Sequence, residues 1–349
     1  MDQGLRDRLV RLHRGHVADY GVVSDDPPIF YVLLPMNALD KFLENYGRLF
    51  SYLRGRRAYC LCGHGWHISS EVFEALSRME EECRRTFPDV ELIHLCNEPE
   101  QDARFRANGS QAVFCNHNCF VDERIFRPLP QVEKRFDAVY DARFASWKRH
   151  GLAGQVRSLA LIYYPWLDDD QEIAVTIRGR LFHAHLFNEV ETGVYQRLSP
   201  MAVNRCLNAC RVGLCLSEEE GAMYASAQYL LSGLPVVTTP SRGGRDVLFE
   251  EPFVLTVPAR ADAVDRGVEE LIGRNLDPGH IREATLAKVR VHRETFVGVV
   301  QKIYERHGVA RRFADEWSQV FYHRMCQPRS HLETIARLSG REPEGDADA

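Results

Sequence analysis

Short apolar runs alternate with amphipathic stretches along most of the chain. In the first part, apolar runs with the length of buried strands lie at 28–35, 58–63, 90–96 and 111–117. Between them, the segments 37–55 and 70–87 repeat apolar residues at the spacing of a helix. Strands and helices in turn favour a parallel sheet with helices on both faces. We therefore predict an α/β domain here.

A second series of the same kind follows the prolines at 128–130. Its predicted strands lie at 136–142, 158–165, 180–187, 212–217, 235–240 and 252–258, and long helices follow at 280–308 and 311–325. We expect no strand after about residue 276, and we expect the polar, acidic tail to be disordered. The predicted division is 1–130, 131–308, C-terminal helices at 309–338 that pack back on the first domain, and a tail at 339–349.

Composition narrows the class of protein. The 349 residues are 45% hydrophobic and 27% charged with a net charge of −5, which favours a folded, soluble protein and gives no overall reason to bind nucleic acid. No apolar run reaches the length of a membrane span, and no signal peptide is recognised, so we expect a cytoplasmic protein. Its ten cysteines are then expected to be reduced and buried.

The first residues predict a basic amphipathic helix over 4–20. Leu5, Leu9 and Leu12 share one stripe, and four arginines surround it. Such a helix packs on its own domain, packs on a second subunit of a homodimer, or lies on the inner face of an anionic membrane. The sequence leaves these alternatives open.

Three consecutive glutamates stand in the segment 217–244, SEEEGAMYASAQYLLSGLPVVTTPSRGG. Ser217 follows an apolar run and predicts a helix N-cap, which would place Glu218, Glu219 and Glu220 in a first turn that favours negative charge. Steps of four residues then put Glu220, Tyr224 and Gln228 along one side of the helix. We expect Glu218 and Glu219 to stabilise the helix end and Glu220 to face a ligand.

The same segment resembles the donor-binding region of retaining glycosyltransferases of family 4, which have the GT-B fold. FVDERIFRP at 120–128 and YDARFASWKRH at 140–150, with its Arg-x4-Lys spacing, extend the resemblance over about 112–275. The family has two Rossmann-like domains that face a cleft, and its C-terminal helices return toward the first domain. The resemblance implies that Arg143 and Lys148 hold the donor diphosphate, that Glu220 contacts the sugar, and that the backbone of Gly221 and Ala222 lies near the phosphates.

The donor side has further candidates. Tyr224 continues the predicted helix face, and Ser241, Gly243 and Gly244 form a tight turn that in the family lies near the donor. Gln228 stands where the family has a second Glu for the ribose, and an amide can still accept a hydrogen bond but carries no charge. An Arg, a Lys and a helix N-terminus can stabilise a leaving nucleotide without a metal, so we predict no metal and read Asp168–Asp170 as a helix cap.

Histidines and asparagines follow two strands of the first domain. His64 and His67 come after one strand, and Asn116, His117 and Asn118 come after another. Because ligands bind at the carboxyl ends of parallel strands, we predict acceptor contacts from His67, Asn116 and Asn118, and proton transfer or acceptor contact from His64 and His117. Zinc bound by nearby cysteines (Cys60, Cys62, Cys115 and Cys119) is the less favoured alternative. His183 and His185 are expected on one face of a strand, in the core or near the nucleotide.

The sequence thus predicts a GT-B-like, hexosyltransferase-type enzyme. It would move a sugar from a nucleotide sugar, UDP- or GDP-linked rather than CMP-linked, to a hydroxyl of a glycan or lipid-linked precursor with retention, as in polysaccharide biosynthesis. Gln228 and the short first domain motivate a second hypothesis, a non-catalytic nucleotide-sugar or glycan-binding module. A phosphorylase of the same architecture that acts on a glycan is a third.

Overall fold

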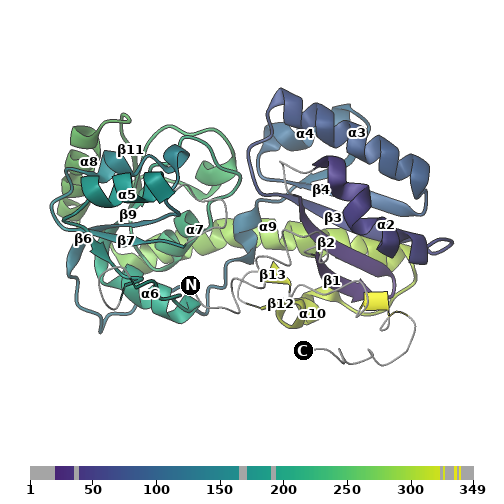
Figure 1. Ribbon diagram of the computed structural model, residues 1–349. Helices are drawn as coiled ribbons and strands as arrows, with labels where there is room; N and C mark the ends of the chain where they lie inside the picture. Colours follow the sequence, from purple (N-terminus) through teal and green to yellow (C-terminus); the bar gives the residue numbers. More distant parts are fainter. Residues whose placement is uncertain are drawn as a thin grey trace. The chain divides into compact units, whose positions relative to one another are not determined.

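A computed structural model describes residues 20–34, 39–164, 171–189, 194–322, 325–326, 334–335 and 338 (Figure 1). The predicted helix at 4–20 lies outside these residues except for Tyr20, which begins a strand, and Asp168–Asp170 and the tail at 339–349 also lie outside them. The chain forms two compact units. The central unit is Val121–Val291, and the terminal unit combines the residues up to Phe120 with those from His292 onward. The predicted division was at 130/131 and 308/309.

The sheet of the terminal unit has five strands in the order β1-β2-β3-β4-β5. They are β1 (Tyr20–Asp25), β2 (Pro28–Leu34), β3 (Ala58–His64), β4 (Val90–Cys96) and β5 (Gln111–Phe114). Strands β2 to β5 are parallel, as predicted, but β1 pairs antiparallel with β2. Strand β1 was not predicted, because YGVVSD is short and contains a glycine and two polar residues.

Two hydrophobic clusters cover the two faces of this sheet. Its connecting helices are α2 (Phe42–Tyr52, after the short η1, Leu39–Lys41), α3 (Ser70–Thr86) and α4 (Pro99–Ala107), and their apolar residues pack in one cluster with alternate residues of β2 and β3. The other cluster joins the remaining residues of these strands to the second half of α9 (Pro278–Arg306) and to α10 (Phe313–Val320). The alternation follows from the two-residue period of a strand.

Short elements complete the terminal unit. The turn η2 (His117–Phe120) follows β5, so the predicted strand at 111–117 is wrong beyond Phe114. The predicted helix at 311–325 ends at Val320 and is followed by a hairpin of β12 (Phe321–Tyr322) and β13 (Met325–Cys326). The prediction that strands stop after residue 276 is therefore also wrong.

The central unit has a six-stranded sheet in the order β11-β10-β9-β6-β7-β8, in which all neighbouring pairs are parallel. The strands are β6 (Phe136–Asp141), β7 (Leu159–Ile162), β8 (His185–Leu186), β9 (Cys210–Cys215), β10 (Val236–Thr238) and β11 (Val254–Thr256). The helices are α5 (Gln171–Arg180), α6 (Pro200–Asn208), α7 (Tyr224–Leu231), α8 (Ala261–Gly273) and the first half of α9. Short turns are η3 (Ser146–Lys148), η4 (His150–Ala153) and η5 (Gly244–Leu248).

Strand β8 is much shorter than predicted. Helix α5 extends to Arg180 and a turn follows it, so His183 precedes the strand and its Nε2 lies 3.1 Å from the carbonyl of Val156. His185 is in β8, where its ring stacks on Phe136. The two histidines therefore do not share a strand face.

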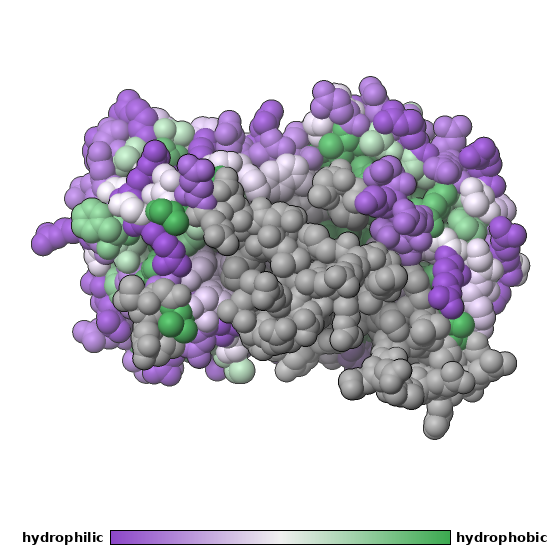
Figure 2. Space-filling model, in the orientation of Figure 1, coloured by the Kyte–Doolittle hydropathy of each residue, from purple (hydrophilic) through white to green (hydrophobic). Residues whose placement is uncertain are grey.

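On the face of the molecule that Figure 2 shows, hydrophobic residues form separate patches between hydrophilic side chains. Among the described residues, the most exposed large hydrophobic residue is Phe182, at 85%. Among the described residues, no helix is both long and apolar enough to cross a bilayer. Nine cysteines among them are free thiols, and all but Cys206 are buried.

Candidate functional site

The strand order of the central sheet reverses direction at β6 and β9, which makes the loops after these two strands the candidate site. The chain starts at β6 in the middle of the sheet, adds β7 and β8 on one side, and adds β9, β10 and β11 on the other. The loops that leave the carboxyl ends of β6 and β9 therefore run in opposite directions. Such a switch point is where open α/β sheets bind ligands. Both loops carry residues that the sequence analysis singled out.

The loop after β6 holds Arg143 and Lys148. The Arg143 guanidinium lies 4.9 Å from the ring centre of Trp147, a cation–π contact. The hydroxyl of Tyr140 donates a 2.6 Å hydrogen bond to the carbonyl of Lys148 and so fixes the main chain there. Lys148 itself is only 7% exposed. The loop thus brings one half-buried and one buried cation to the switch point.

The loop after β9 corrects the prediction for the three glutamates. Helix α7 begins at Tyr224, not at Ser217, so none of Glu218, Glu219 and Glu220 is in its first turn. The reason is that the main chain of this segment pairs with neighbouring loops instead. The Glu218 amide donates to the Trp147 carbonyl, the Glu220 amide donates to the Arg242 carbonyl, and the Arg242 amide donates to the Glu218 carbonyl.

Each glutamate has its own environment in this extended segment. Glu218 is exposed, and Glu219 forms a 2.6 Å ion pair with the exposed Arg242. Glu220 is 6% exposed, and its Oε1 forms an ion pair with Nζ of Lys148. Two buried opposite charges in contact stabilise each other, whereas either one alone would be costly to bury. The structure therefore unites the residue predicted for the sugar with one predicted for the phosphate.

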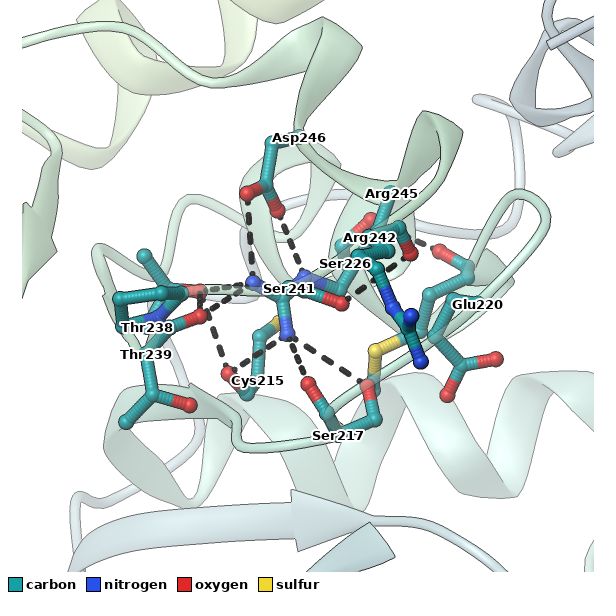
Figure 3. A network of polar contacts seen from close by, with 12 residues as sticks. Cys215, Ser217, Glu220, Ser226, Thr238, Thr239, Ser241, Arg242, Arg245 and Asp246 are labelled. Carbon is teal, nitrogen blue, oxygen red and sulfur yellow. Dashed lines mark hydrogen bonds and ion pairs between the residues drawn. The ribbon is translucent and has the colours of Figure 1, made fainter. Parts of the chain in front are cut away.

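Arg245 is a residue that the sequence analysis missed. Its side chain is fully buried at the start of η5 and is paired with Asp246 at 2.6 Å (Figure 3). Its guanidinium donates to the carbonyls of Cys215 and Ser217 at the end of β9 and to the hydroxyl of Thr238 and the carbonyl of Thr239 at the end of β10. These bonds hold the Glu218–Glu220 segment to its neighbour loop.

Arg149 is a second residue that was missed. Its backbone is in the left-handed region, with φ 50°, which is uncommon for a residue other than glycine. Its Nε donates to the Leu216 carbonyl at 2.6 Å, and its Nη2 donates to Thr239 Oγ1 at 2.8 Å and to the Pro240 carbonyl at 3.2 Å. No sequence signal marks this role, because the basic run Lys148-Arg149 also suits a solvated turn.

The remaining donor-side candidates lie close to this segment. Gly221 and Ala222 connect it to α7, whose first residue is Tyr224, and Gln228 is buried in the same helix. Because Glu220 precedes α7, the predicted stripe of Glu220, Tyr224 and Gln228 is wrong, and only the last two share the helix. Ser241, Gly243 and Gly244 lie in the loop after β10, where Gly243 has φ 100° and thus requires a residue without a side chain.

Asn97 ties together the carboxyl ends of three strands in the terminal unit. Its side chain donates to the carbonyl of His64, the last residue of β3, at 2.8 Å and accepts from the His117 amide after β5 at 3.0 Å. Its own carbonyl accepts from the Asn116 side chain. Asn97 is fully buried and was not predicted. It gathers the predicted residues of two loops at one edge of the sheet.

His117 and Asn118 lie at this edge. Nε2 of His117 is hydrogen-bonded to the Tyr31 hydroxyl, and burial lowers the His117 pKa to about 4. The ring is therefore neutral near pH 7. Asn118 is fully buried, and its side-chain oxygen and nitrogen have no hydrogen-bond partner among the described residues.

His64 is placed differently from His117. Its ring lies on the α4 side of the sheet, stacked with Phe105, while the His117 ring packs against Tyr31 and Phe120 on the other side. His64 Nε2 lies 3.2 Å from His94 Nδ1, and the other ring nitrogen of His94, Nε2, lies 3.4 Å from Oε2 of Glu80. Burial holds the pKa of the enclosed His64 well below its ordinary value. This environment argues against direct contact of the His64 ring with a substrate.

His67 has an acidic neighbour. Its Nδ1 lies 3.6 Å from Oε2 of Glu98, and both side chains are partly exposed, as an acceptor-side pair would need to be. Among the described residues, no cluster of histidine, cysteine and carboxylate side chains has the arrangement of a metal site.

Comparisons with known proteins bear on the fold. No family model matches the sequence, and no curated protein matches it. Solved structures do resemble the structure. Sucrose-phosphate synthase (tll1590) from Thermosynechococcus elongatus has a TM-score of 0.55 at 14% identity, over 80% of this chain and 82% of its own. Anabaena Alr3699/HepE in complex with UDP-glucose has a TM-score of 0.54 at 15% identity, over 78% of each chain.

A third structure, TarM, has a TM-score of 0.52 at 12% identity over 73% of this chain, and the chain spans 58% of its length. These neighbours are glycosyltransferases of the GT-B fold. At such low identity the likeness establishes the architecture. The protein therefore has the GT-B fold, with two Rossmann-like parallel-sheet units, as the sequence predicted.

Proposed function

We propose that the protein is a retaining glycosyltransferase of the family 4 type. It takes a hexose from a UDP- or GDP-linked donor, in the cytoplasm, and transfers it to a hydroxyl of a glycan or lipid-linked precursor. The observation that carries the proposal is the buried Lys148–Glu220 pair at the switch point of the central sheet. HepE, which was crystallised with UDP-glucose, supports a UDP-sugar as the donor.

The central unit would bind the donor. Arg143 and Lys148 offer positive charge to the diphosphate, and the amides at the start of α7 add the positive end of a helix. Glu220 accepts hydrogen bonds from sugar hydroxyls while it remains beside Lys148. Cations held in a buried site stabilise the charge that develops on the leaving nucleotide. Tyr224, Gln228, Ser241, Gly243 and Gly244 are proposed to contact the rest of the donor.

The terminal unit would supply the acceptor side through His67, Asn116, His117 and Asn118. In the transfer, the bond from the sugar C1 to the phosphate oxygen breaks and a bond from C1 to the acceptor oxygen forms on the same face. The acceptor proton moves to the departing phosphate. Neutral His117 would orient the acceptor hydroxyl rather than carry the proton away.

The test is nucleotide release from a panel of UDP-, GDP- and CMP-sugars, with glycan and lipid-linked acceptors, in the presence and absence of EDTA. We expect acceptor-dependent release from a UDP- or GDP-sugar that EDTA does not abolish. Loss of activity in EDTA with rescue by manganese would contradict the metal-independent site. If no donor in the panel gave acceptor-dependent nucleotide release, the proposed function would be rejected.

A binding module is the second candidate, and buried, uncharged Gln228 favours it. In that case, the protein would bind a nucleotide sugar in calorimetry and release no nucleotide with any acceptor.

We further propose that the protein associates with the membrane surface and forms a homodimer. Sedimentation with anionic vesicles tests the first proposal, and light scattering tests the second.

A further inference from the structure

We infer that Arg149 is an additional ligand of the donor diphosphate. The inference rests on the proposed donor site. Arg149 is the residue directly after Lys148, and its left-handed backbone turns the chain between the two side chains. Lys148 can thereby reach Glu220, while Arg149 reaches the ends of β9 and β10.

The charges of the neighbouring cations are already balanced. Lys148 is paired with Glu220, and Arg245 is paired with Asp246. Arg149 differs, because the three oxygens to which it donates are two carbonyls and one hydroxyl, all uncharged. The carboxylate that acts on it through space is Glu218, which is exposed to solvent. A guanidinium that is partly buried without a paired carboxylate favours an incoming anion.

The geometry leaves one edge of the guanidinium available. Arg149 uses Nε and Nη2 for the loop oxygens, and among the described residues no oxygen accepts from Nη1. The bonds to the loops fix the plane of the guanidinium before any ligand arrives, so little side-chain entropy is lost on binding. The side chain is partly exposed, as a ligand contact requires.

The experiment compares UDP with uridine as calorimetric probes of the full chain, and GDP with guanosine if GDP binds more tightly. The variants are Arg149→Met, Arg149→Lys and Arg149→Gly, and Arg266→Met on α8 is the control for loss of one exposed arginine. Melting temperatures show whether each variant is folded. Glycine adopts a left-handed backbone without strain. Arg149→Gly therefore removes the guanidinium without adding backbone strain, and shows which of the two effects lowers UDP affinity.

We expect Arg149→Met and Arg149→Gly to raise the Kd of UDP about 10- to 100-fold, as for a lost charge-assisted contact, with the Kd of uridine within about twofold of the wild type. Arg149→Lys should recover part of the UDP affinity, and Arg266→Met should match the wild type. Equal losses for UDP and uridine would mean a purely structural role and overturn the inference, as would unchanged UDP binding in Arg149→Gly. A wild-type protein that binds no nucleoside diphosphate would reject the proposed function and the inference with it.

Discussion

Lys148 and Glu220 are 72 residues apart in the sequence and form an ion pair in which both side chains are buried. The resemblance assigns these residues to different parts of a donor, the phosphate and the sugar. Their contact means that a donor would meet both charges side by side. It also means that removing the charge of either residue would leave the other as a buried charge without its partner.

The first prediction concerns the stability of this pair. Lys148→Met should lower the free energy of unfolding by about 3–5 kcal/mol, because Glu220 is left buried without a partner. The double variant Lys148→Met/Glu220→Leu should recover most of that loss, since no charge remains buried. Urea denaturation measures both. Arg242→Met breaks the exposed pair with Glu219 and should cost less than about 1 kcal/mol. A double variant as unstable as the single one would contradict the role of the charge.

The second prediction separates the three glutamates. Glu220→Gln should lower transfer, because a neutral amide stabilises an electron-poor transition state less well than a carboxylate does. Glu218→Gln should leave turnover unchanged, since that side chain is exposed, and Glu219→Gln should lose only its surface pair with Arg242. Turnover and melting temperature are measured for the three side by side. Equal turnover in all three variants would remove Glu220 from the site.

The third prediction is a loss of stability in mild acid. Burial lowers the pKa of both His117 and His150 to about 4. Between about pH 6.5 and 4 these side chains bind a proton in the unfolded chain but not in the folded one. The free energy of unfolding should therefore fall as the pH falls through this window, by up to about 3 kcal/mol for each histidine.

Urea denaturation at several pH values measures this slope. His150→Gln should flatten it, because the variant has no imidazole at that position to bind a proton in the unfolded chain. A slope that is the same in the wild type and in His150→Gln would show that His150 does not stay neutral in the folded protein.

The fourth prediction uses two glycines at the end of β3. A Cβ on Gly63 would lie 2.8 Å from both His117 Cε1 and the Tyr31 hydroxyl, whereas a Cβ on Gly65 would meet Leu33 at an ordinary 3.7 Å. Gly63→Ala should therefore cost about 1–3 kcal/mol and displace the His117 ring. Gly65→Ala should be nearly neutral. Urea denaturation, with the imidazole NMR signals as a readout of His117, tests the pair; equal stability of the two variants would contradict the close packing.

Regular elements with buried faces could be predicted from the sequence. β2, β3, β4 and β6 are apolar runs between turns, and α9 keeps its helical spacing over 29 residues, so local pattern and tertiary structure agree. Strand β8 was overestimated, because RLFHAHLF is apolar enough for a strand although its first residue ends α5.

The site was harder to predict than the fold. Ser217 followed by three acids has the local pattern of a helix start, yet main-chain pairing with Arg242 and Trp147 holds the segment extended. Hydrogen bonds to distant parts of the chain therefore outweigh the local preference of this segment to start a helix. Lys148, Arg149 and Arg245 each contact a residue at least 28 positions away in the sequence, and no local pattern identifies these distant partners.

Helix α9 belongs to both units, and the terminal unit is assembled from two separated stretches of chain. During synthesis, the central unit is complete once Val291 has emerged, whereas one face of the terminal sheet must wait for residues beyond His292. Until then Tyr31, Tyr59 and Leu61 lack the cover that Phe296, Val300 and Phe313 later provide. A nascent chain arrested near residue 291 would therefore carry a folded central unit beside an uncovered apolar sheet, a species prone to aggregate and to recruit chaperones.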